Sequence, residues 1–176
     1  MLKSKRGLFV GRFQPFHYGH LHAIKWILER EEELVVVIGS AQYSHSLRNP
    51  FTLGERLEMI AAALKAEGLW SRVIPVGVPD TNGVHSLWVQ LVISCSPRFS
   101  RVYTNDPLTS LLFREAGYPV SAIPFFKREV YEGTRIRELM AMGEEWEKLV
   151  PPSVVRVIRE IGGVDRIKRL KRIGKN

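Results

Sequence analysis

Residues 8–20 have the sequence LFVGRFQPFHYGH, and this stretch decides how the rest of the chain is interpreted. Its first three residues are apolar and indicate a buried strand, and the apolar spacing after His20 indicates a helix. The segment between them is therefore a turn from a strand into a helix. Such turns lie at the carboxyl ends of parallel strands, where open α/β sheets bind their ligands.

Several groups in this turn suit a phosphate. Gly11 lets the backbone leave the strand sharply and leaves room for a ligand. His17 and His20 are three residues apart at the helix start, so they can face the same way. The helix N-terminus offers unpaired N–H groups, and Arg12 adds a guanidinium. The stretch predicts a phosphate-binding site; the alternative is that the histidines are simply solvated or packed.

The same stretch argues against other kinds of site. No cysteine or carboxylate accompanies the two histidines, so no metal-ligating side chains are expected. The glycines fit neither the P-loop pattern G-x-x-x-x-G-K-[ST] nor the dinucleotide fingerprint G-x-G-x-x-G.

Two motifs resemble those of a known superfamily. Residues 17–20, His-Tyr-Gly-His, match the H-x-G-H motif of the nucleotidyltransferases, and the longer run from Gly11 is similar to that of the archaeal nicotinamide mononucleotide adenylyltransferases. Residues 133–137, Gly-Thr-Arg-Ile-Arg, resemble the family's second motif, S-G-T-x-I-R, with Glu132 in place of its serine. The resemblance runs from about Leu8 to the C-terminal helices.

The resemblance implies an activity and its substrates. Enzymes of this family transfer AMP from ATP to the 5′-phosphate of nicotinamide mononucleotide (NMN), giving NAD and pyrophosphate. Mg²⁺ would arrive with ATP, bridging phosphate oxygens. The nucleophile is already an ionised phosphate, so catalysis would consist of positioning and charge stabilisation at the α-phosphate. Family analogy also implies a homo-oligomer, a hexamer.

Residues of both motifs receive roles by this resemblance. His17 and His20 are expected at the phosphates and the transition state, with His17 near the α-phosphate. Arg12 and Arg137 would hold the triphosphate, and Thr134 can donate to a phosphate or cap the helix that it opens. The expected ATP-binding residues are Gly11, Arg12, Phe13, His17, Gly19, His20, Gly133, Thr134 and Arg137, of which His17, His20, Arg12 and Arg137 are catalytic.

The acceptor site is expected at the ends of neighbouring strands. Residues 34–39 are an apolar run that indicates a second buried strand, and small residues follow it. The resemblance implies that Trp88 stacks on the nicotinamide ring, and an indole face suits a cationic ring; the alternative is a core residue of an amphipathic helix, although Leu87 and its neighbours can supply that core. The expected acceptor residues are Gly39, Ser40, Arg48, Asp80 and Trp88.

The remainder of the chain alternates strands and helices. Further strands are expected at residues 73–78, 101–104 and 120–126. Pro75 favours an edge position for the first of them. Thr52 and Glu55 form a capping box at one helix start, and Asp106 caps another helix. The alternation predicts an α/β fold, a Rossmann-like doubly wound parallel sheet of about five strands with C-terminal helices from about residue 133.

Composition limits the classes of protein to which this chain can belong. The chain has 176 residues with 45% hydrophobic and 25% charged side chains, which favours a single domain over residues 1–176. No apolar run approaches the ~18 residues that suggest a membrane span. The one cysteine, Cys95, excludes an internal disulfide, and its apolar neighbours suggest a buried thiol. These features favour a cytoplasmic protein.

The net charge is +8, and much of it lies between Arg156 and Lys175. A basic surface attracts nucleic acid or polyphosphate, but solvated faces of terminal helices are favoured here because no aromatic residue interleaves the tail.

Two alternatives to the implied activity stay open. One is a sister transferase with another phosphate-bearing acceptor, and the other is a nucleotide- or nucleic-acid-binding protein without turnover.

Overall fold

The structure is a computed structural model that describes residues 5–174, so Lys175 of the basic tail lies outside the described residues. The contacts group the residues into two compact units. The sheet unit consists of residues 5–12, 23–42 and 71–124, and the helical unit of residues 13–22, 43–70 and 125–174. Whether the chain behaves as one domain stays a prediction.

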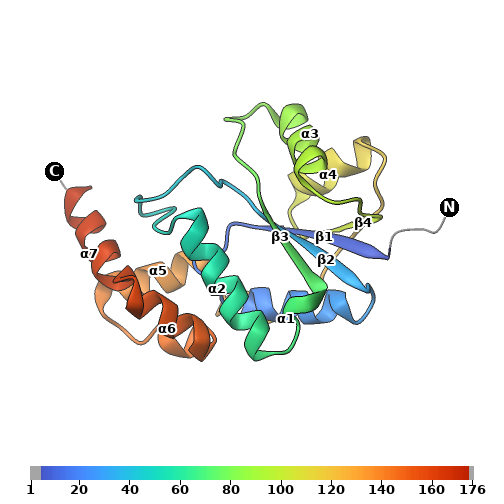
Figure 1. The fold of residues 1–176 in the computed structure, drawn as a ribbon. Coiled ribbons are helices and arrows are strands. Elements are labelled where there is room, and N and C mark those ends of the chain that lie inside the picture. The colour runs from blue at the N-terminus through green and yellow to red at the C-terminus, as the bar shows by residue number, and fades with distance from the viewer. Residues whose placement is uncertain (1–4, 175–176) are drawn as a thin grey trace. The chain divides into compact units, whose positions relative to one another are not determined.

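Five parallel strands form the sheet unit, in the order β3-β2-β1-β4-β5 (Figure 1). They are β1 (Arg6–Gly11), β2 (Glu33–Ile38), β3 (Val73–Gly77), β4 (Arg101–Tyr103) and β5 (Val120–Ser121). Phe9 of β1 pairs with Val36 of β2 on one side and with Tyr103 of β4 on the other. The strand order reverses at β1, as in doubly wound folds, and the predicted fold class is confirmed.

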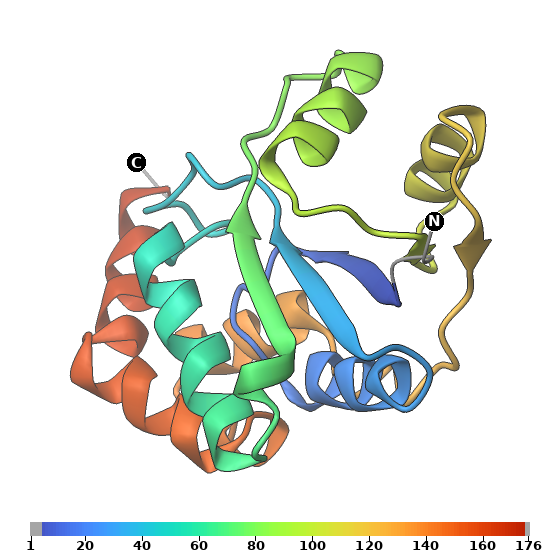
Figure 2. The same cartoon turned by 45° about the vertical axis from the view of Figure 1, so that its right-hand side comes forward.

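Helices cover the sheet on both faces, which explains why β2 is apolar from Leu34 to Ile38 (Figure 2). On one face lie α3 (His85–Cys95) and α4 (Pro107–Glu115). Their residues Val89, Val92 and Phe113 are buried in one cluster with strand residues Leu8 and Val35. The other face is covered by the part of α1 (Tyr18–Leu28) that belongs to this unit, from residue 23 on.

Of two predictions about the strands, the edge position of Pro75 is confirmed and the length of the last strand is wrong. Pro75 lies in β3 at the edge of the sheet, as predicted. The strand predicted at 120–126 ends at Ser121 instead. The side-chain amide of Asn105 there replaces a strand partner: its Nδ2 donates to the Ile123 carbonyl (2.7 Å), and its Oδ1 accepts from the Ile123 N–H (2.8 Å).

The capping residues predicted at two helix starts are confirmed. The capping box of Thr52 and Glu55 is present, and Asp106 caps α4 by accepting from the Thr109 N–H.

The prediction that Cys95 is a buried thiol was wrong. It is exposed, because α3 buries only Val89 and Val92 and ends at Cys95.

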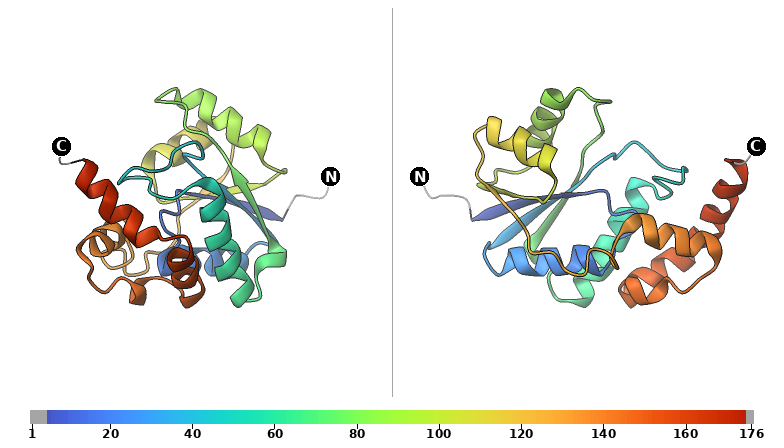
Figure 3. Two further views of the ribbon diagram at one scale, coloured as in Figure 1. Left: turned by 60° about the vertical axis from the view of Figure 1, so that its left-hand side comes forward. Right: turned by 180° about the vertical axis from the view of Figure 1, so that it is seen from behind.

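The helical unit contains four α-helices besides the first turn of α1. They are α2 (Leu53–Ala66), α5 (Gly133–Met142), α6 (Pro152–Glu160) and α7 (Gly163–Ile173), with the short 3₁₀ helix η2 (Glu147–Leu149). A second 3₁₀ helix, η1 (Trp70–Arg72), contains residues of both units. Helix α2 packs against α6, and α7 packs against α5 and α6 (Figure 3). Val154, Val155 and Ile158 form the buried face of α6.

A bidentate ion pair joins α7 to the start of α2. Arg166 donates to both carboxylate oxygens of Glu55 (2.6 and 2.7 Å) and to the Pro50 carbonyl (3.1 Å). We expect Arg166→Met to lower the free energy of unfolding by about 2 kcal/mol, since the partly buried carboxylate loses its partner. Arg169→Met, at an exposed position of α7, should change it by less than about 0.5 kcal/mol. Urea denaturation measures both, and equal effects would contradict the expectation.

Candidate active site

The stretch from Gly11 to His20 is a tight turn followed by the first turn of α1, in which the H-x-G-H motif lies. Phe13 has a φ of +53°, which is uncommon for a residue with a side chain, and the Gln14–Pro15 peptide bond is cis. The rings of Phe13 and Phe16 are buried, and each lies against the His20 ring, with centroids 4.5 and 5.6 Å away. The apolar residues of the motif therefore orient its second histidine.

The two histidines stack on each other and have a defined tautomer. Their ring centroids are 3.7 Å apart. The Gly19 N–H donates to Nδ1 of His17 (3.1 Å), and the His17 N–H donates to Nδ1 of His20 (3.3 Å). A neutral imidazole whose Nδ1 accepts carries its proton on Nε2. Each ring therefore has one N–H donor left for a ligand.

Both histidines are neutral at physiological pH. Burial, together with the charge of Arg137, lowers the pKa of His17 to about 3. Burial and the neighbouring His17 lower the pKa of His20 well below its usual value. The pair therefore presents neutral hydrogen-bond donors and contributes no net charge at this position.

These lowered pKa values predict a loss of stability in acid. Below pH 6.5 the unfolded chain binds protons at both histidines, whereas folded His17 binds none until about pH 3. The free energy of unfolding should therefore fall with decreasing pH below 6.5, by about 1.4 kcal/mol per pH unit for each such histidine. Denaturation midpoints at pH 7.5 and 5 measure this. His17→Asn, which does not titrate, should flatten the slope, and an unchanged slope would contradict the assignment.

The second motif opens α5 in the helical unit. Helix α5 begins at Gly133, and its N-cap residue is Glu132, whose side chain makes no capping hydrogen bond. The alternative that Thr134 caps this helix is therefore wrong. Thr134 Oγ1 instead accepts from Nη2 of Arg137 (3.2 Å).

Arg137 is buried and joins three segments of the helical unit. It is 8% exposed. Its Nε donates to the Leu47 carbonyl (2.9 Å), and its Nη1 donates to the Gln14 carbonyl (2.8 Å). A Cβ at Gly133 would lie 3.0 Å from this Nη1 and 3.3 Å from the Gln14 carbonyl, which explains the glycine. Arg137 thus organises the loops, and its predicted contact with the triphosphate stays a prediction.

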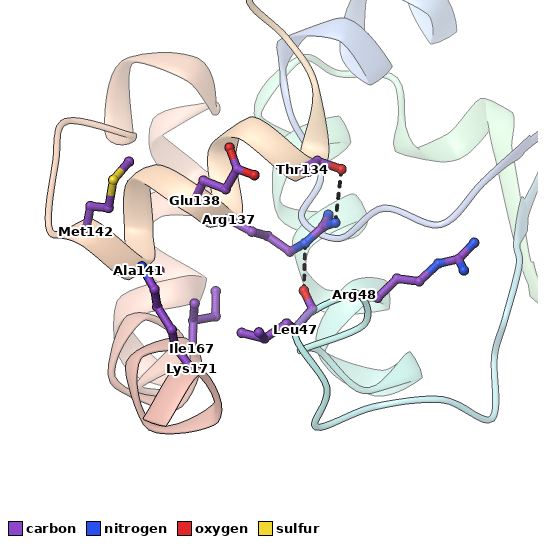
Figure 4. A pocket seen from close by; sticks show the side chains of 9 residues that line it. All are labelled: Leu47, Arg48, Thr134, Arg137, Glu138, Ala141, Met142, Ile167 and Lys171. Carbon is purple, nitrogen blue, oxygen red and sulfur yellow. Dashed lines mark hydrogen bonds between the residues drawn. The ribbon is translucent and has the colours of Figure 1, made fainter. Parts of the chain in front are cut away.

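A cavity of about 540 Å³ brings three predicted site residues together, namely Arg48, Thr134 and Arg137 (Figure 4). This volume lies in the range of small-ligand pockets. Leu47 and Ile167 give the cavity an apolar wall. The guanidinium of Arg48 extends away from that wall.

In the sheet unit, the predicted residues gather at the carboxyl ends of three strands. Gly11 and Arg12 end β1 or follow it, Gly39 and Ser40 follow β2, and Asp80 follows β3. The Gly39 N–H donates to the Gly11 carbonyl (2.9 Å), so the first two loops start side by side.

Trp88 lies in α3, as predicted, and is half-buried. Its ring meets Phe113 edge-on, with centroids 5.9 Å apart. Leu87, expected to supply the core in its place, is 51% exposed. Trp88 therefore packs partly on the core, and its contact with a nicotinamide ring stays a prediction.

One residue that sequence reasoning missed is Gln14, within the first motif. It is 3% exposed, and its amide pairs with the backbone of Phe51 through two hydrogen bonds. No sequence signal marked this contact, because both partners of the amide are backbone groups.

Two kinds of feature are absent from the part of the chain that the structure describes. No cluster of three or more His, Cys, Asp or Glu side chains there is arranged to hold a metal ion. None of its helices has the length and apolar character needed to cross a membrane.

This chain is similar in sequence to a known protein family and to relatives of known activity. The family model described as cytidylyltransferase-like matches residues 8–139. The nicotinamide-nucleotide adenylyltransferase of Pyrococcus horikoshii is 48% identical over 94% of this chain and 88% of its own length. That of Thermoplasma acidophilum is 48% identical over 96% of this chain and 93% of its own length.

Solved structures share the fold at lower identity. A bifunctional NMN adenylyltransferase/ADP-ribose pyrophosphatase from Francisella tularensis, complexed with AMP and a manganese ion, has a TM-score of 0.76 at 20% identity. The similarity covers 94% of this chain and 51% of that one. A nicotinate-nucleotide adenylyltransferase, described as putative, from Vibrio parahaemolyticus has a TM-score of 0.59 at 17% identity, over 92% and 94% of the two chains.

Proposed function

Because this chain belongs to the cytidylyltransferase-like family and, within it, to the nicotinamide-nucleotide adenylyltransferases, we propose that it transfers the adenylyl group of ATP to NMN, giving NAD and pyrophosphate. The geometric observation that carries this proposal is the stacked pair His17 and His20, each with a free Nε2–H. Two neutral donors at one point suit the oxygens of a phosphate in transfer.

The reaction needs no general base. A phosphate oxygen of NMN attacks the α-phosphorus of ATP, and the bond from that phosphorus to the bridging oxygen breaks, so pyrophosphate leaves with the electron pair. We assign the Nε2–H of His17 to a non-bridging α-phosphate oxygen and that of His20 to the same transferring group. Gly133, Thr134 and the amides at the start of α5 bind the β- and γ-phosphates. Arg12 and Arg137 add positive charge to the departing pyrophosphate.

The sheet-unit loops receive the acceptor in this proposal. Gly39 and Ser40 let the NMN ribose approach the backbone, and Asp80 and Trp88 take the nicotinamide end. From the helical unit, we assign Arg48 to the NMN phosphate. Support comes from the shared strand edge and from the exposed guanidinium of Arg48. Trp88 offers a half-exposed indole to a flat cationic ring.

Further properties are proposed from the family. ATP would enter as its magnesium complex, and the cation, held mainly by the triphosphate, would add positive charge that stabilises the departing pyrophosphate. We propose that the enzyme works in the cytoplasm, where its substrates occur, as a homo-oligomer. Light scattering, with a hexamer as the expected state, tests the last point.

Pyrophosphate release from ATP and Mg²⁺ tests the function. NMN is the expected acceptor, with nicotinate mononucleotide, phosphopantetheine, FMN and glycerol phosphate as comparison acceptors. NAD in the product confirms the proposal. Release with a different acceptor alone would keep the phosphate site and overturn the acceptor assignment. No release with any acceptor would leave a nucleotide-binding protein.

A further inference from the structure

Two glutamines make the same unusual pairing with the backbone. In the helical unit, Nε2 of Gln14 donates to the Phe51 carbonyl (3.0 Å), and its Oε1 accepts from the Phe51 N–H (2.9 Å). In the sheet unit, Nε2 of Gln42 donates to the Asp80 carbonyl (2.9 Å), and its Oε1 accepts from the Asp80 N–H (2.9 Å). Each glutamine side chain thus makes the two backbone hydrogen bonds that a neighbouring strand would make in a sheet.

Each glutamine follows a backbone conformation that needs support. Phe13, directly before Gln14, has a φ of +53°, and Ser40, two residues before Gln42, has a φ of +48°. Residues with side chains rarely adopt such angles, and they persist where the surroundings determine them. The amide pairs lie beside these residues, in the two loops that leave β1 and β2.

The segments joined by these pairs carry the residues assigned to the two substrates. Gln14 lies three residues before His17, and its carbonyl also accepts from Arg137 (2.8 Å). Gln42 holds Asp80, whose Oδ1 accepts from the Asn82 N–H (3.2 Å). The Ala41 N–H donates to the Val78 carbonyl (3.1 Å), which continues the same contact between loops.

We propose that Gln14 and Gln42 are positioning residues, one for each substrate: Gln14 for the phosphates of ATP and Gln42 for the acceptor nucleotide. The assignment of sides rests on the proposed function. A misplacement of about 1 Å at a reacting centre costs up to about 100-fold in rate, so loss of either pair should be measurable without unfolding the protein.

Methionine substitutions test the proposal, because methionine keeps the length of glutamine and forms no comparable hydrogen bonds. We expect Gln14→Met to raise the KM for ATP about tenfold and to leave the KM for NMN within about twofold. Gln42→Met should do the reverse. Each variant is the comparison for the other: both lose two hydrogen bonds to the backbone of one loop residue, a buried pair at Gln14 and a solvent-exposed pair at Gln42.

If Gln14 and Gln42 only stabilise the fold, the substitutions change the kinetic constants differently. Partial unfolding lowers the concentration of active enzyme, so the apparent kcat falls while both KM values stay unchanged. That outcome, or a rise in the same KM in both variants, would overturn the proposal.

Failure of the proposed function is distinguishable from failure of this inference. If the wild-type protein releases no pyrophosphate with NMN, calorimetry with Mg-ATP alone still measures the ATP site. Gln14→Met should then weaken ATP binding about tenfold, and Gln42→Met should leave it unchanged. Equal ATP affinities in wild type and Gln14→Met would overturn the role of Gln14.

Discussion

His17→Asn should lower kcat about 10²–10³-fold while leaving the protein folded, because one donor to the transferring phosphate is lost. The asparagine Oδ1 can still accept from the Gly19 N–H, as Nδ1 of His17 does at 3.1 Å. No group then reaches the position of the imidazole Nε2. Steady-state kinetics together with far-UV circular dichroism measure the two effects.

His17→Gln is the matched comparison. Its amide N–H reaches toward the position of Nε2 but gives up the contact with Gly19. We expect it to retain kcat within about tenfold of wild type, since the donor to the phosphate is kept. If asparagine supports turnover as well as glutamine does, His17 acts through the turn and not through its Nε2–H.

Gly19→Ala should lower kcat/KM about 100-fold, because the new methyl group displaces the His17 ring. A Cβ at this position would lie 2.9 Å from Cε1 and 3.0 Å from Nδ1 of His17. On its other side, Cβ of Tyr131 is 3.2 Å away, so the methyl group has no free direction. The glycine in H-x-G-H is thus a requirement of the ring stack.

Gly54→Ala is the control for this substitution. Gly54 lies in the first turn of α2, and its Cβ would meet only Thr52 Oγ1 at 3.9 Å. We expect unchanged activity and a free energy of unfolding equal to wild type or higher by about 0.5–1 kcal/mol, since alanine favours the helix. Wild-type activity in Gly19→Ala would show that the histidine ring tolerates displacement.

The elements with strong local signals were predictable from the sequence. An apolar run at 34–39 has few interpretations other than a strand covered on both faces, and Thr52 with Glu55 specifies a helix start by itself. Pro75 indicated an edge because a strand without one N–H is tolerated there. Order along the chain then gave the doubly wound sheet.

Features that depend on partners distant in sequence were not predictable. Asn105 shortens β5 by pairing with Ile123. The motif predicted Arg137 as a phosphate ligand, which stays a prediction, but it did not indicate that Arg137 donates to the carbonyls of Gln14 and Leu47. A backbone carbonyl is the same in every residue type, so the sequence carries no mark of where such an acceptor lies. The Gln14 contact with Phe51 is hidden for the same reason.

The order of the two units along the chain has a consequence for inheritance. The chain passes from one unit to the other after residues 12, 22, 42, 70 and 124. A genetic crossover at any codon from 13 to 123 would therefore join parts of both units from different parents. Where the crossover falls between codons 14 and 51, or between codons 42 and 80, the hybrid would also combine Gln14 with Phe51, or Gln42 with Asp80, from loops that had not diverged together. We expect related genes to exchange this sequence whole, and its lineages to show few recombination breakpoints within it.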